Sequence, residues 1–202
     1  MARQAWFAEG AAQIVEFAVA LPLLVVFVVG IFDFSNAFTL KQKLTNVTRD
    51  AARTAAAEPT TDLGNPTPPL PVSVQDAFYI IDNYLRANNI NDCGIGIANG
   101  NATAIPLTWR FSIAASGPTG CGITIIINRG YYYSLPTPVP QPPLTCDTRS
   151  SVTAAETQMV GTCITVQYSY PWRFGQAASL IGGNGRGLPT MISAQAIAAN
   201  EF

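Results

Sequence analysis

Apolar residues fill the chain from Phe17 to Phe32 with no charged or strongly polar side chain. At about 1.5 Å per residue this run makes a helix of roughly 24 Å, a little short of the roughly 30 Å hydrocarbon core of a bilayer. Extension back to Ile14 nearly closes that gap and brings Glu16 into the run. The pattern therefore predicts a membrane-spanning helix over residues 14–32, with a carboxylate near one end that is either hydrated at the interface or held there to bind a partner.

A helical pattern continues beyond the apolar run. Past Asp33, apolar residues recur three or four positions apart until Glu58-Pro59 stops the pattern, because a residue before proline avoids the helical region. We predict one helix over residues 12–58, kinked at Pro22, because proline removes a backbone hydrogen bond. The predicted buried stripe is Leu40, Leu44, Val47, Ala51 and Ala55.

Two other interpretations of the N-terminal segment differ from a retained anchor. A soluble core helix would show a polar face, and this run has none. A cleaved secretory signal peptide would use the small residues Ser35-Asn36-Ala37 as its site, but Glu9 and Glu16 make a poor n-region. A retained anchor fits the continuing helical pattern better than either.

The rest of the chain predicts a small exported domain after a proline-rich linker over residues 59–71. Residues 72–202 open with a helix capped by Ser73 and continue as strands rich in Ile, Val, Thr and Tyr. One long helix packed against a small antiparallel sheet is an α+β fold, pilin-like in outline. The expected strands are Gly94–Ala98, Leu107–Ala114, Cys121–Asn128, Tyr131–Ser134, Cys163–Tyr170 and Met191–Ala199.

The same pattern predicts which strand faces are buried and where the aromatic side chains lie. The aliphatic stretch ITIIIN predicts a strand buried on both faces, whereas CITVQYSY alternates and predicts one buried face. The aromatic clusters Tyr131–Tyr133 and Tyr168–Trp172 are expected to pack against the sheet, with an adhesive or membrane-proximal surface as the alternative. The glycine-rich stretch Gly182–Gly187 predicts a hairpin turn rather than an anion site.

Composition argues against catalysis. The chain has 202 residues, 11% charged, a net charge of -1 and no histidine. The lack of histidine excludes Ser-His and Cys-His nucleophiles, and there is no phosphate-binding loop. Sparse lysine and arginine exclude a nucleic-acid interface. We expect no catalytic residue, no cofactor and no metal site. Only eight charged side chains lie from Cys93 to Phe202, which favours a subunit packed against neighbours or an extracellular domain held by disulfides.

The cysteines decide the predicted topology. Basic residues follow the span in excess, which by the positive-inside rule would leave the C-terminal domain in the cytoplasm. Four cysteines without a CxxC pair argue instead for an oxidising compartment. We give the cysteines more weight and predict an exported domain with two disulfides, whose pairing stays open. The cysteines are Cys93, Cys121, Cys146 and Cys163.

The segment GAAQIVEFAVALPLLVVFVVGIFDFSNAF, followed by QKLTNVTRDAARTAA, resembles the TadE-like family of minor pilins or pseudopilins of tight-adherence (Flp-type) pilus systems. The C-terminal stretch ITVQYSYPWRF…ANEF also looks like the family's closing strands. The resemblance implies a non-enzymatic, single-pass protein of the bacterial inner membrane. Its partners would be the lipid bilayer, other pilin subunits and the pilus assembly machinery, with incorporation into an extracellular pilus left open. The alternative is a membrane-anchored adhesion module outside any pilus.

The resemblance also implies processing by a prepilin peptidase. With Glu16 at the fifth mature position, the cut falls between Ala11 and Ala12 and releases residues 1–11 as a leader. A cut after Gly10, or no cut, stays open, because the family's glycine stands one place early. A new amine at Ala12 would pair with Glu16 and register subunits. That pairing would offset the roughly 2.5–3.5 kcal/mol that a carboxylate costs at the bilayer centre.

Overall fold

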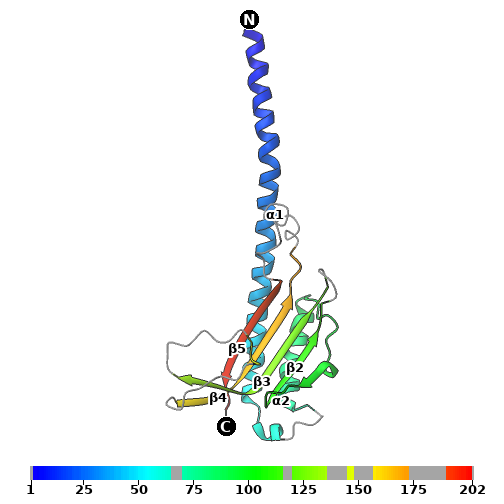
Figure 1. The fold of residues 1–202 in the computed structure, drawn as a ribbon, viewed down its shortest axis with the longest axis vertical. Helices are drawn as coiled ribbons and strands as arrows, with labels where there is room; N and C mark the ends of the chain where they lie inside the picture. The colour runs from blue at the N-terminus through cyan, green and yellow to red at the C-terminus, as the bar shows by residue number, and fades with distance from the viewer. Residues whose placement is uncertain are drawn as a thin grey trace. The chain divides into compact units, whose positions relative to one another are not determined.

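The computed structural model describes residues 2–64, 70–115, 120–135, 145–147, 157–172 and 190–201 (Figure 1). The chain forms two compact units. One unit contains Met1–Phe38 and Trp172–Leu188, and the other contains Thr39–Pro171 and Pro189–Phe202.

The predicted long helix is present as α1, which spans Ala2–Ala57 and passes through Pro22. In the second unit its buried residues include Leu44, Val47 and Ala51, each at most 1% exposed. These positions belong to the stripe with spacings of three and four that the sequence indicates. The one-sided burial shows that α1 contributes a helix face to the core from Thr39 onward.

Within the described residues, the sheet is a five-stranded antiparallel meander in which each strand pairs with the next along the chain. The α+β prediction is confirmed. Helix α2, Val72–Ala87, stacks Phe78 on Phe111 of β2 with ring centroids 4.6 Å apart. Figure 1 shows α2 and the end of α1 on the same side of the sheet. The strands are β1 (Gly100–Ala102), β2 (Thr108–Ile113), β3 (Ile123–Leu135), β4 (Thr157–Ser169) and β5 (Met191–Ala199).

The aliphatic run at the start of β3 is buried on both faces, as its sequence predicts. Ile125, Ile126 and Ile127 are each at most 1% exposed. Ile125 pairs with Phe111 and so faces the helices, whereas Ile126 faces the opposite, outer side of the sheet. On the outer side it clusters with Tyr131, Cys146 and Cys163. The core therefore has two layers, one on each face of the sheet.

The prediction that β4 buries one face is wrong. Residues 161–166 are buried without interruption, including the polar Thr162 and Thr165. The physical reason is the segment 145–147: Cys146 is disulfide-bonded to Cys163, and its amide donates to Thr165 Oγ1 at 3.0 Å. The disulfide holds that segment over the outer face of β4. The alternation of apolar and polar residues alone would predict that this face is exposed to solvent.

The predicted strand Gly94–Ala98 is also wrong. Cys93 and Gly94 have left-handed φ values of 58° and 71°, and a short 3-10 helix, η2 (Ile97–Asn99), follows. Asn91 Oδ1 accepts from the Cys93 amide at 2.9 Å, and Asp92 Oδ1 accepts from the Gly94 amide at 2.9 Å. Such local side-chain bonds compete with strand pairing. The short strand β1 follows η2 directly instead.

Three smaller expectations also change. The two strands predicted over 121–134 are one strand, β3, with a register irregularity between Asn128 and Tyr131. Ser73 does not cap α2, because Pro71 is the N-cap and Ser73 is buried inside the helix. In the linker, Thr60–Gly64 forms a 3-10 helix, η1. The predicted Gly182–Gly187 hairpin lies outside the described residues.

Candidate membrane anchor and assembly surface

The apolar part of α1 is exposed on every side. Side chains from Gln13 to Phe32 are exposed or half-buried, with Phe17 at 66% and Ile31 at 68%. The first buried side chain after them is Asp33, at 3%. At about 1.5 Å per residue, residues 13–32 are roughly 30 Å long, which equals the hydrocarbon thickness of a bilayer. Among the described residues, this is the one helix long and apolar enough to cross a membrane.

The predicted assembly residues all belong to α1. Glu16 is exposed and lies one turn after Gln13, near the N-terminal end of the apolar segment. Pro22 lies inside the helix and cannot donate to the carbonyl of Ala18; a kink there stays a prediction. Gly10, Ala11 and Ala12 are helical, and cleavage beside them stays a prediction.

A buried arginine holds the C-terminal end of α1 against the sheet. Arg129 of β3 is 0% exposed. Its Nη1 donates to the carbonyl of Ala55, and its Nη2 donates to the carbonyl of Glu58 at 2.9 Å. The last carbonyls of a helix lack intrahelical donors and carry partial negative charge. The guanidinium therefore satisfies the end of α1 and is itself stabilised by the helix dipole.

Polar side chains from β4 and from the residue after β5 complete this arginine site. Arg129 Nη1 also donates to Thr162 Oγ1 at 2.8 Å, and Thr162 Oγ1 donates to Asn200 Oδ1 at 2.7 Å. Asn200 Nδ2 returns a bond to the Arg129 carbonyl at 3.1 Å. The Glu201 amide donates to the Ala56 carbonyl at 3.0 Å. Elements far apart in sequence therefore meet where the long helix ends.

Sequence reasoning missed Arg129. The available signal is its position: an arginine follows directly on the aliphatic run ITIIIN in a strand predicted to be buried. A charge at such a place requires hydrogen-bond partners. The sequence does not say that the partners are helix carbonyls, because those belong to a segment more than 70 positions earlier.

The four cysteines form two disulfides, as predicted, and the structure gives the pairing. Cys93 bonds to Cys121 with Cα atoms 5.4 Å apart, and Cys146 bonds to Cys163 with Cα atoms 5.6 Å apart. The first joins the turn after α2 to the segment just before β3. The second fixes segment 145–147 on β4. Disulfides persist in oxidising compartments, which supports an exported domain.

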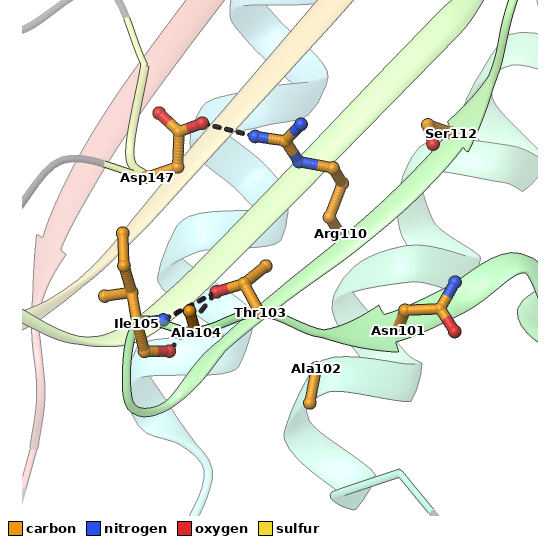
Figure 2. A pocket seen from close by; sticks show the side chains of 8 residues that line it. All are labelled: Asn101, Ala102, Thr103, Ala104, Ile105, Arg110, Ser112 and Asp147. Carbon is orange, nitrogen blue, oxygen red and sulfur yellow. Dashed lines mark hydrogen bonds and ion pairs between the residues drawn. The ribbon is translucent and has the colours of Figure 1, made fainter.

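An open hollow of about 400 Å³ lies on the outer side of β1 and β2 (Figure 2). Arg110 forms an ion pair with Asp147 across it, and Thr145 Oγ1 donates to the same carboxylate. The Cys146–Cys163 disulfide positions this carboxylate, because Asp147 is its neighbour in sequence. The pair carries no net charge. The hollow is lined by Asn101, Ala102, Thr103, Ala104, Ile105, Arg110, Ser112 and Asp147.

Two buried tyrosines have shifted pKa values. Burial raises the pKa of the Tyr131 hydroxyl. Burial, and secondarily the charge of Asp92, raises the pKa of the Tyr168 hydroxyl. Both rings are at most 9% exposed, in agreement with the predicted sheet packing, whereas Tyr132 is 49% exposed. Within the described parts of the chain, no three His, Cys, Asp or Glu side chains gather in a group suited to a metal ion.

Comparison with known proteins agrees with the resemblance drawn from the sequence. The family model described as TadE-like protein matches residues 11–53. No curated protein and no solved structure is significantly similar to this chain. The family match does not reach the C-terminal stretch, where the resemblance stays a prediction. The N-terminal segment of this chain, residues 11–53, which carries Glu16, Pro22 and the apolar span, is therefore similar to the TadE-like proteins.

Proposed function

We propose that this chain is a non-enzymatic minor pilin or pseudopilin that takes part in assembly of a tight-adherence pilus. The observation that carries the proposal is the segment 13–32, which is apolar, exposed on every side, and part of the stretch similar to TadE-like proteins. Exposed apolar surface of this extent needs lipid or other helices around it. The segment offers both an anchor and a surface for neighbouring subunits.

In this proposal the chain crosses the inner membrane once and exports its disulfide-bonded domain. Two disulfides support export, and the Arg129 site joins the exported domain to the end of the anchoring helix. Glu16 registers neighbouring subunits from its place near one end of the span. A partner amine would offset the cost of placing its carboxylate in lipid.

Photo-crosslinking in cells that produce the pilus system tests the proposal. A benzophenone amino acid at Leu24, which is 62% exposed, should form adducts with a pilin subunit. The same group at Phe78, which is 1% exposed, is the matched control and should form none. A third position, Tyr132, tests the adhesion alternative, because it is 49% exposed in the exported domain. Adducts with a non-pilin envelope partner from Tyr132, without pilin adducts from Leu24, would favour that alternative.

A further inference from the structure

Trp172 packs against the long helix at the end of its apolar segment. Its ring lies 5.3 Å from that of Phe34, centroid to centroid, with the planes inclined by 58°. Both residues belong to the compact unit that contains the apolar part of α1. Trp172 is half-buried, and Phe34 remains 58% exposed. The contact therefore leaves aromatic surface open beside the helix.

The position of this pair along α1 can be compared with the layers of a bilayer. If residues 13–32 fill the hydrocarbon core, Asp33 is the first charged residue beyond it. Phe34 and Phe38 then lie within about 8 Å of that boundary. The headgroup layer on each side of a membrane is roughly 5–8 Å thick. Phe38 is 64% exposed, so aromatic surface continues through this depth.

The chemistry of the pair matches that layer. Tryptophan is enriched at the membrane–water interface, because its ring is apolar and its indole N–H needs a polar partner. If only solvent surrounded this region, the exposed phenylalanine side chains would lie in water, next to a segment that already requires lipid. The aromatic surface is continuous with the proposed anchor, and this continuity favours the bilayer over a separate protein partner.

We infer that Trp172 and Phe34 form an interfacial pair that seats in the phospholipid headgroup layer. This gives the chain a second membrane contact, from the segment after β4, in addition to the α1 span. The inference rests on the proposed membrane anchor. Its partner is the headgroup and glycerol layer of ordinary phospholipids, recognised by depth and polarity rather than by a specific headgroup.

Depth-dependent fluorescence quenching tests the inference on the full chain. The natural tryptophans are Trp6, Trp109 and Trp172, so the chain W6F/W109F reports on Trp172 alone. It is reconstituted into phosphatidylcholine–phosphatidylglycerol vesicles whose lipids carry bromine either near the carbonyl end or near the methyl end of the acyl chain. We expect shallow bromine to quench Trp172 about twofold more strongly than deep bromine, since the pair lies outside the hydrocarbon core.

Two further single-tryptophan chains separate this inference from the anchor itself. The chain W6F/W172F keeps Trp109, which is 1% exposed, and should be quenched by neither lipid. The chain W6F/W109F/W172F/F27W places a reporter inside the span, where deep bromine should quench it. If Phe27→Trp is quenched and Trp172 is not, the interfacial pair is refuted and the anchor stands. If neither is quenched, the anchor and the proposed function fail together. Protection of Trp172 from aqueous acrylamide without lipid quenching would refute the bilayer as partner and indicate a second copy of the chain.

Discussion

The Arg129 site gives the sharpest test of how the long helix is joined to its domain. Replacement by methionine keeps an apolar stem of similar length and removes all the guanidinium donors. The carbonyls of Ala55 and Glu58 then lose the charged donors that they have in the native protein. Since the Arg129 side chain is fully buried, water does not readily replace those donors.

The magnitude follows from the contacts. Hydrogen bonds to charged groups contribute about 1.5–3 kcal/mol each, so loss of the Ala55 and Glu58 bonds removes about 3–6 kcal/mol. Methionine also avoids the desolvation penalty of a buried charge, which is several kcal/mol before compensation. We therefore expect Arg129→Met to lower the free energy of unfolding by about 2–4 kcal/mol. The free energy of unfolding of Arg129→Lys should lie between those of the wild type and Arg129→Met. A single ammonium group cannot reach the partners of both Nη1 and Nη2.

Denaturant titration of the full chain in detergent micelles measures this effect. Emission from Trp109, which is 1% exposed, reports unfolding in a W6F/W172F background, and linear extrapolation gives the free energy. Arg110→Met is the matched control, because the side chain of Arg110 is 44% exposed in its ion pair with Asp147. Such pairs contribute at most about 1 kcal/mol. If Arg129→Met costs no more than Arg110→Met, the helix-end contacts do not stabilise the fold.

Two other predictions concern the outer layer and the tyrosines. Replacing Cys146 and Cys163 together by serine opens a loop with a sequence separation of 17. It should lower the free energy of unfolding by about 3 kcal/mol in the same titration. An unchanged midpoint, or four reactive thiols in the exported wild-type protein, would contradict the disulfide assignment. The raised pKa of Tyr168 means that the folded state holds its phenolic proton more tightly than the unfolded state. That contribution is fully present below the ordinary pKa of about 10 and is lost as pH rises through the folded pKa. Stability should therefore decrease above about pH 10, and Tyr168→Phe should weaken the decrease, whereas an identical alkaline profile for both proteins would exclude Tyr168 as its source.

Local signals in the sequence predict the regular elements well. Apolar spacing locates α1 through Ala57, and the predicted strand Met191–Ala199 coincides with β5. Both depend on periodicity within one element, which the sequence displays directly. The same is true of the doubly buried run Ile123–Asn128, because an uninterrupted aliphatic strand leaves no polar face for solvent.

What the sequence does not predict depends on contacts between distant segments. The hydrogen-bond acceptors of Arg129 include the end of α1 and Asn200. The cover over β4 comes from a segment held by one disulfide, whose pairing four cysteines leave open. The absence of the strand predicted at Gly94 has a local cause. The side chains of Asn91 and Asp92 accept hydrogen bonds from backbone amides there. A propensity argument does not weigh such bonds against strand formation.

The proposed function requires this chain as an anchored subunit during assembly of a pilus. The most direct test counts pili per cell by electron microscopy in a strain that lacks the chain, complemented with wild type or Glu16→Ala. We expect few or no pili without the chain and recovery with wild type. We expect reduced numbers with Glu16→Ala although that variant is membrane-anchored at the wild-type level. Wild-type numbers of pili in the strain without the chain would contradict the proposed function.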